Sequence, residues 1–170
     1  MIIKNKAVID DEWSVLHLGD ADQPENITVP TGKIIVPLKV WLAQRVALSQ
    51  RTDVGVWFAS HERAEELQSD VRKFPVIAVD FPKFSDGRGY SIAYHLRNRF
   101  GYRGELRAIG DVLRDQLFYM QRMGFDSFAV RACNNIHAAL KSLNDFSISY
   151  QAAVDDSRPL FRRVQRGAII

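Results

Sequence analysis

The chain has 170 residues, 46% of them hydrophobic, and a formal net charge of +3 at pH 7. This is enough apolar material for one substantial core, so we expect one globular domain. The sequence has no apolar run near the roughly 20 residues of a membrane span, and its amino terminus lacks a secretory pattern. The single cysteine, Cys133, excludes an intramolecular disulfide and fits a reducing compartment. We therefore expect a cytoplasmic protein with no membrane partner.

Charge is divided unevenly along the chain. Residues 1–70 carry 7 Lys/Arg and 11 Asp/Glu, whereas residues 71–170 carry 16 and 9, and 13 of those 16 cations are arginine. Arginine presents a fixed fork of donors that suits carboxylates, phosphates and sulfur oxyanions, which favours a small anionic ligand or an acidic protein partner. Alternatively, many of these arginines lie on solvated helix faces. A nucleic-acid partner is not expected, because no RNP-like motif, zinc-finger spacing or basic-helix array is present.

The predicted elements divide the chain into three parts. Residues 1–32 form an N-terminal β extension, in which two short strands pair across a turn at Asn5-Lys6. Residues 33–152 form an α/β domain, in which apolar runs typical of strands alternate with helical patterns. Residues 153–170 form a basic tail. The predicted strands of the α/β domain are 34–36, 54–59, 76–81, 105–109, 125–130 and 146–149.

This alternation predicts right-handed crossovers and a mostly parallel sheet of about six strands. An open doubly wound sheet is the first interpretation, and a partial barrel is the second. A complete eight-stranded barrel typically needs about 250 residues, so one chain is too short to form it. A second copy of the chain would be one way to complete a partial barrel, so a homo-oligomer stays open.

The segment 76–91 is the most informative part of the sequence. Its strand ends in Asp80, and a polar loop containing Gly87 and Gly89 follows. Polar groups at the carboxyl ends of parallel strands are where α/β proteins usually bind ligands. The glycines permit close approach to a ligand, and the helix that begins near Arg88 favours an anion at its start. The predicted ligand-binding residues of this loop are Asp80, Lys83, Ser85, Asp86, Arg88, Tyr90 and Ser91.

A purely structural interpretation of this loop is also open. In it, Asp80 and Asp86 cap backbone groups and Arg88 pairs with one of them. Ser60 and His61 follow the preceding strand, so they are expected at the same edge of the sheet.

Three more candidates follow the next two strands. Asp111 is expected to cap a helix, and Arg114 lies in the first turn of that helix, where it opposes the dipole and calls for a carboxylate or a ligand. Arg131 is a candidate for anion binding. Cys133 is either a reactive thiol near a helix start or a small buried residue. The four histidines show no metal-ligand spacing, so we predict no metal site and no cofactor, with Mg²⁺ between Asp80, Asp111 and a phosphate as the exception to test.

Two long runs resemble a known bacterial family. They are Val-Ile-Ala-Val-Asp-Phe-Pro-Lys-Phe-Ser-Asp-Gly-Arg-Gly-Tyr-Ser (76–91) and Gly-Glu-Leu-Arg-Ala-Ile-Gly-Asp-Val-Leu-Arg-Asp-Gln (104–116), followed by Met-Gly-Phe-Asp (123–126). The family is of unknown function and is commonly labelled "oxidoreductase probably involved in sulfite reduction". The resemblance extends from Ile34 to Tyr150. It implies a link to assimilatory sulfate or sulfite reduction, beside a siroheme sulfite reductase, and it carries over no catalytic residue.

The residues themselves show no redox centre. The chain has no cysteine cluster, no Cys-x-x-Cys and no Gly-x-Gly-x-x-Gly after a strand. We therefore expect an accessory protein of sulfite reduction that binds an anionic ligand or partner at the carboxyl edge of its strands. The alternative is an enzyme acting on a phosphorylated or sulfur-oxyanion metabolite, with Asp80 or Asp111 as base and Lys83, Arg88, Arg114 or Arg131 as oxyanion clamps. A structural homo-oligomer subunit is a third interpretation.

Overall fold

Eight strands form one sheet, in the order β2-β1-β8-β7-β6-β5-β4-β3. The structure is a computed structural model and describes residues 1–19, 21–132 and 135–163. Strands β3 to β8 run parallel to one another, and β1 is antiparallel to both β8 and β2. The strands are β1 Ile2–Lys4, β2 Ala7–Ile9, β3 Ser14–Val15, β4 Ile34–Pro37, β5 Val54–Phe58, β6 Val76–Phe81, β7 Glu105–Gly110 and β8 Ser127–Phe128.

Helices connect the parallel strands from β4 to β8, and further helices follow β8. In chain order they are α1 Leu38–Ala43, α2 Arg45–Leu48, the 3₁₀ helix η1 Ala64–Lys73, α3 Arg88–Asn98, the 3₁₀ helix η2 Arg114–Gln116, α4 Leu117–Arg122, α5 Ile136–Ser142 and α6 Leu160–Arg163. None of the helices in the described ranges has the length and hydrophobicity to cross a bilayer.

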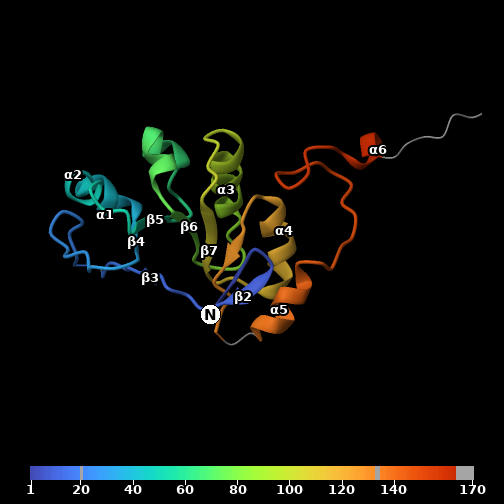
Figure 1. Ribbon diagram of the computed structural model, residues 1–170, viewed down its shortest axis with the longest axis horizontal. Helices are drawn as coiled ribbons and strands as arrows, with labels where there is room; N and C mark the ends of the chain where they lie inside the picture. Colours follow the sequence, from blue (N-terminus) through green and yellow to red (C-terminus); the bar gives the residue numbers. More distant parts are fainter. Residues whose placement is uncertain (20, 133–134, 164–170) are drawn as a thin grey trace, which may run out of the picture.

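The sheet is a curled half-barrel. Strands β3 to β8 follow one another across the sheet in chain order, and the helices form an outer arc around the inner arc of strands (Figure 1). A doubly wound sheet needs a reversal of strand order, which would place helices on both faces. That first interpretation is therefore wrong, and the partial barrel is the correct one. Because the strand order does not reverse, crossovers of one hand carry the helices to one face of the sheet.

The predicted strand count is also corrected. The sheet has eight strands rather than about six, because the N-terminal hairpin joins the sheet and β3 precedes β4. The hairpin turn is confirmed: Asn5 and Lys6 have φ of 49° and 62°, the conformation of a type I′ turn. Residues 146–149 are not a strand. The place beside β8 is taken by β1, whose Ile3 side chain is fully buried there.

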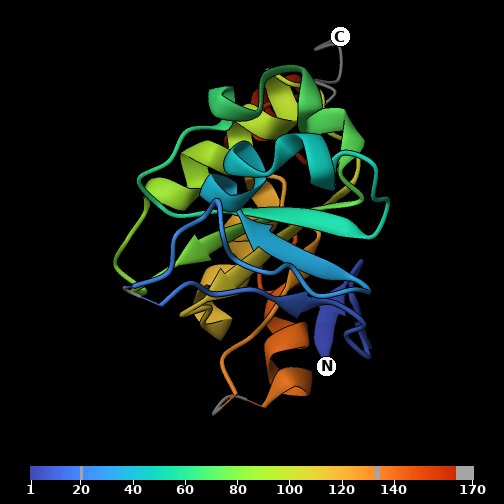
Figure 2. The ribbon, with the colours of Figure 1, turned by 90° about the vertical axis from the view of Figure 1, so that its left-hand side faces the viewer.

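The core has two parts, one on each side of the sheet. On the convex side, alternate strand residues such as Val56 and Val79 pack against helix residues such as Leu96. On the concave side, a smaller cluster of Ile35, Val76, Ala78 and Ile109 packs against the partly buried Trp13 and Trp57. Figure 2 shows α1, η1 and α3 above β4 and β5, with the N-terminal chain below them. The N-terminal extension therefore covers the face that the helices leave open.

Candidate functional site

The loops that follow β6, β7 and β8 meet at one edge of the sheet, as the parallel topology predicts. Phe81 at the end of β6 pairs with Gly110 at the end of β7. The Asp111 N–H donates to the Phe81 carbonyl at 2.7 Å, and the Arg131 N–H donates to the Val112 carbonyl at 3.1 Å. The predicted candidates after these three strands therefore share the carboxyl edge.

Asp111 connects two of these loops instead of capping a helix. Its Oδ2 accepts the Phe84 N–H at 3.1 Å, and its Oδ1 accepts Arg131 Nη1 at 3.1 Å. The N-cap of η2 is Leu113, so the predicted capping role of Asp111 is wrong. With both oxygens engaged, Asp111 holds the loop after β6 against the loop after β8.

Asp80 has a different environment. Its side chain is half-buried, and in the described ranges no N–H or hydroxyl donates to its carboxylate. Burial raises the pKa of Asp80, while the charge of His17 lowers that pKa and the charge of Asp86 raises it. A half-buried carboxylate without a hydrogen-bond donor is suited to take up or release a proton.

Gly110 makes room for the Asp80 carboxylate. Its φ is +88°, and a Cβ placed on it would lie 2.4 Å from Asp80 Oδ1 and 2.5 Å from the Phe81 carbonyl oxygen. Both the backbone conformation and the close approach require glycine at this position.

His17 lies near this carboxylate, and the sequence reasoning missed it. Residue 17 follows β3, so it lies at the same edge as the ends of β4 to β8. Its ring centroid is 5.8 Å from that of Trp57, whose Nε1 donates to the Leu16 carbonyl at 2.9 Å. Recognising Ser14–Val15 as a strand would have placed His17 at this edge.

Arg88 and Asp86 form a tight pair at the start of α3. Arg88 donates to Asp86 from Nε at 2.9 Å and from Nη2 at 2.7 Å, and Nη2 also lies 2.9 Å from the buried Ser60 hydroxyl. The Arg88 backbone N–H donates to Asp86 Oδ1 at 3.2 Å. These bonds hold the pKa of Asp86 well below its usual range. The structural interpretation therefore holds for Arg88 and Asp86, and the protein's own carboxylate occupies the first N–H of the helix.

The remaining predicted residues lie at the edge without joining one another. Lys83, Ser85 and Arg114 are exposed. Tyr90 is half-buried, with ring centroids 5.2 Å from Phe81 and 5.0 Å from Tyr119, and burial raises the pKa of its hydroxyl. Tyr90 is therefore a packing residue. Cys133 and residues 164–170 of the basic tail lie outside the described residues.

A cavity of about 560 Å³ opens beside this edge, between the chain after β5 and α3. Of the residues that line the cavity, Ser60, His61, Arg88 and Ser91 were expected at this edge from the sequence. Arg63 and His95 were not. The spacing of Arg88, Ser91 and His95 puts these three on one face of α3, a signal available in the sequence. The cavity is lined by Ser60, His61, Glu62, Arg63, Ala64, Glu65, Arg88, Ser91, Ile92 and His95.

Both acids of this lining have partners elsewhere. Glu62 accepts the Ala59 N–H at 2.6 Å, and burial raises its pKa. Glu65 pairs with Arg99 at 2.7 Å. Of the two acids, Glu65 is therefore neutralised by Arg99, and Glu62 is turned toward the backbone of Ala59.

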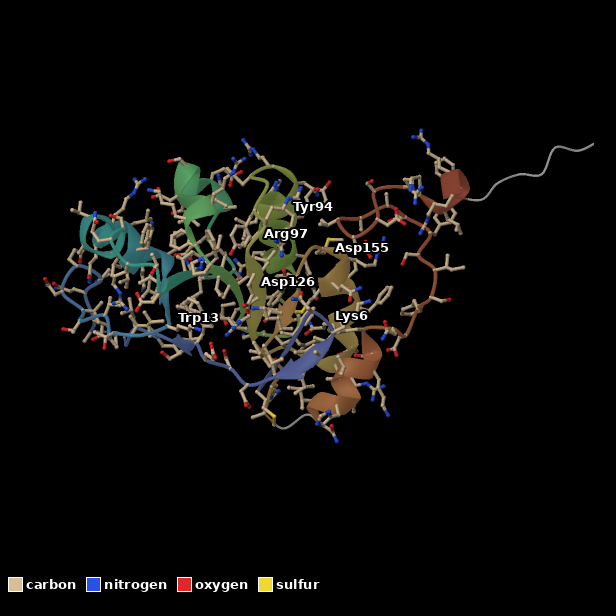
Figure 3. The ribbon with its side chains drawn as sticks, in the orientation of Figure 1. Lys6, Trp13, Tyr94, Arg97, Asp126 and Asp155 are labelled. Carbon is tan, nitrogen blue, oxygen red and sulfur yellow. The ribbon has the colours of Figure 1, made fainter. Side chains whose placement is uncertain are left out.

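The far end of α3 is fixed by Arg97. Its Nη2 donates to Asp126 Oδ2 at 2.7 Å, its Nε to the Gly124 carbonyl at 2.8 Å, and its Nη1 to the Tyr102 and Gly104 carbonyls at 2.9 Å each. Figure 3 shows the Arg97 and Asp126 side chains pointing toward each other. These contacts set the position of α3, and hence of the face that lines the cavity.

The arrangement does not suit a metal ion. The described part of the chain contains no group of three His, Cys, Asp or Glu side chains able to hold one. A Mg²⁺ ion between Asp80 and Asp111 would have to displace Arg131 or the Phe84 N–H from Asp111.

The fold and this edge define an α/β half-barrel whose parallel strands end in a polar, arginine-rich rim. The chain belongs to a family of bacterial proteins of unknown function (DUF934), whose sequence model matches residues 55–161. The match contains both long runs that carry the resemblance, and it begins inside β5 rather than at Ile34. Searches of the curated proteins and of the solved structures found no match.

Proposed function

We propose that this protein is an accessory protein of assimilatory sulfate or sulfite reduction that binds an anionic ligand or an acidic partner at its carboxyl edge. The observation that carries the binding proposal is the cavity of about 560 Å³, which is lined by two arginines and two histidines and by two acids, of which Glu65 is paired with Arg99 and Glu62 accepts the Ala59 N–H. Its volume lies in the range of small-molecule sites. The connection to sulfur metabolism comes from the family resemblance of residues 76–91 and 104–116.

The donors of the cavity suit an oxyanion. Arg88 is held by Asp86 and Ser60 through Nε and Nη2, with its side chain 63% exposed, so its Nη1 group is fixed in direction and reachable from solvent. Arg63 makes no ion pair with the described residues. Charge-assisted hydrogen bonds from guanidinium groups to sulfate, sulfite or phosphate oxygens are strong and directional.

The rest of the edge offers a surface for an acidic partner. The Phe84 side chain is 62% exposed. Its loop is nevertheless fixed, because the Phe84 N–H donates to Asp111 and the Phe84 carbonyl accepts Gln116 Nε2 at 2.8 Å. Lys83 and Arg114 are exposed beside it. An ordered aromatic side chain next to arginine is typical of protein interfaces.

An enzyme acting on an anionic metabolite is the second candidate, and Asp80 favours it. The raised pKa of a half-buried carboxylate is the property that a general acid or base needs. Asp80 is the better base of the two predicted candidates, because Asp111 is engaged by Arg131 and the Phe84 N–H.

Ligand binding is tested by thermal unfolding with sulfite, sulfate, phosphate and adenosine phosphosulfate. A ligand at about 100 times its Kd adds about 2.7 kcal/mol to the unfolding free energy, which raises Tm by several degrees in a chain of this size. We expect Arg63→Ala and Arg88→Ala to abolish the shift. Arg103→Ala, an exposed arginine on the connector before β7, is the matched control and should keep it.

The partner proposal needs its own experiment. We expect sulfite reductase subunits to copurify with the full chain and to be lost with Phe84→Ala or Arg131→Ala, but not with Arg103→Ala. A flat thermal response to all four anions together with no copurification would rule out the binding proposal. Turnover of an anionic substrate that Asp80→Asn abolishes, with its thermal shift kept, would favour the enzyme instead.

A further inference from the structure

The chain after α5 exposes an unusual run of apolar side chains. Residues 144–163, here called the C-terminal segment, run along the outside of the molecule to α6 (Figure 1). Phe146, Ile148 and Tyr150 in its first part are 63%, 64% and 68% exposed. Single exposed apolar residues are common on proteins, but three within five residues indicate a surface that another molecule covers.

The segment is held in place by its own chain. Arg122 donates to the Gln151 carbonyl, Arg163 donates to the Ser149 carbonyl, and the Leu160 N–H donates to the Tyr150 carbonyl at 3.0 Å. The ring of Phe146 lies 4.9 Å from that of Phe118. The exposed side chains are therefore presented in a fixed direction, which lowers the entropic cost of binding.

The backbone of the same residues has hydrogen-bonding capacity to spare. Within the described ranges, no backbone hydrogen bond involves the N–H or carbonyl groups of Phe146, Ser147 or Ile148. The alternation of apolar and polar residues from Phe146 to Tyr150 is that of a β-strand, although the chain forms no strand here. The run therefore has the side chains of a strand that lacks a neighbour and, from Phe146 to Ile148, the backbone groups as well, whereas the Ser149 and Tyr150 carbonyls each already accept one hydrogen bond.

The order of residues in this run suggests that the missing neighbouring strand is the same run of a second copy of the chain. Phe146-Ser-Ile-Ser-Tyr150 reads as aromatic, serine, isoleucine, serine, aromatic in both directions. About a two-fold axis through Ile148, antiparallel pairing sets Phe146 opposite the partner's Tyr150 and serine opposite serine. Two-fold interfaces require this kind of self-complementary surface, and cross-strand aromatic pairs stabilise it. Residues 146–154 themselves carry no charge, and the Arg163 guanidinium that donates to the Ser149 carbonyl is paired with Asp156.

We propose that two copies of this chain associate through residues 146–150, paired antiparallel about a two-fold axis at Ile148. Three side chains a copy bury less than the roughly 1,200 Å² of a standard stable interface. The dimer is therefore weak, with a Kd on the order of micromolar. This association is independent of the anion site, which lies at the start of α3.

Sedimentation velocity and light scattering on the full chain, from about 1 μM to about 300 μM, test the dimer. We expect the mass to rise toward two chains with concentration. Ile148→Asp places two carboxylates at the axis and should weaken association by more than about tenfold. The control is Val46→Asp on α2, a residue that is 88% exposed and should leave association unchanged. Circular dichroism should show both variants folded, because both positions face solvent.

Crosslinking tests the register. In a Cys133→Ser background, Ile148→Cys sets each new thiol against its own copy across the axis, so mild oxidation should give a disulfide-linked dimer. Val46→Cys should not. The proposal is overturned by a monomer at every concentration, by Ile148→Asp associating as the unchanged chain does, or by a dimer that oxidation of the Ile148→Cys variant fails to link.

Discussion

The Arg107 guanidinium donates to both carboxylate oxygens of Asp11, at 2.9 Å and 3.0 Å, and so joins β7 to a residue 96 positions earlier in the chain. The Arg107 side chain is 1% exposed and also pairs with Glu105 at 2.7 Å. Glu105 in turn pairs with Lys4 of β1 at 2.6 Å. This buried network ties the N-terminal extension to the concave face of the half-barrel.

Replacing Asp11 should therefore destabilise the whole fold. Asp11→Ala leaves Arg107 buried with one acid instead of two, and we expect a loss of about 2 kcal/mol in the free energy of unfolding. Urea denaturation measures it. Asp10→Ala, an exposed neighbour, is the control and should change stability by less than about 0.5 kcal/mol. Equal effects of the two substitutions would contradict a role for the network.

Gly110→Ala should be costly for two separable reasons. The new Cβ meets Asp80 Oδ1 and the Phe81 carbonyl within 2.5 Å, and φ is +88°. Gly32 shares the strained backbone, with φ of +93°, but has nothing within 4 Å of a Cβ. We expect Gly32→Ala to cost about 1 kcal/mol and Gly110→Ala at least about 2 kcal/mol more. Thermal or urea unfolding gives the difference, and similar losses would show that the close approach to Asp80 does not matter.

Asp80 and Asp86 should shift stability with pH in opposite directions. The pKa of Asp80 is raised above the usual 3.8, so its contribution is present below pH 3.8 and is lost as pH rises through the raised pKa. The pKa of Asp86 is lowered, so its contribution is present above pH 3.8 and is lost as pH falls through the lowered pKa.

At pH 7, Asp80→Asn should therefore stabilise the protein and Asp86→Asn should destabilise it. The Asp80→Asn difference should shrink as pH falls through the raised pKa of Asp80 toward 3.8, whereas the Asp86→Asn difference should shrink only as pH falls below 3.8. Urea midpoints from about pH 3 to about pH 8 give the two profiles. A change of the same sign for both variants at pH 7 would contradict the opposite environments of the two carboxyl groups.

Arg97 should be far less tolerant of substitution than Arg99, which lies two positions later on the chain. A lysine at position 97 can replace one of the four hydrogen bonds that Arg97 makes, so Arg97→Lys should cost about 3 kcal/mol. Arg99 pairs with Glu65 on the surface, and Arg99→Lys should cost less than about 0.5 kcal/mol. Chemical denaturation of the two variants decides it, and a loss below about 1 kcal/mol at position 97 would show that these bonds contribute little.

The alternation of apolar runs and helical patterns was sufficient to predict the parallel strands from β4 to β8. It was insufficient for the ends of the sheet. Strand β3 has two residues, which is too few for an alternation of apolar and polar residues to be recognised. Its pairing with β4 is stabilised because Trp13 and Val15 pack against the concave cluster. Residues 146–149 have the clearer pattern, but β1 occupies the position beside β8. In both cases packing in the folded protein, rather than the local sequence pattern, decided whether a strand formed.

The candidate site was predictable to the same degree. Parallel topology correctly placed Asp80, Asp111 and Arg131 at one edge, because the ends of neighbouring strands must meet. Which side chains pair there depends on loop geometry, so the bond from the Phe84 N–H to Asp111 had no sequence signal. His17 was missed together with β3.

The half-barrel ends in two very short strands. One outer strand, β2, has three residues, and the other, β3, has two. An incoming chain would find few backbone groups with which to extend the ladder at either margin. Fibre growth by strand addition therefore has little template at these margins.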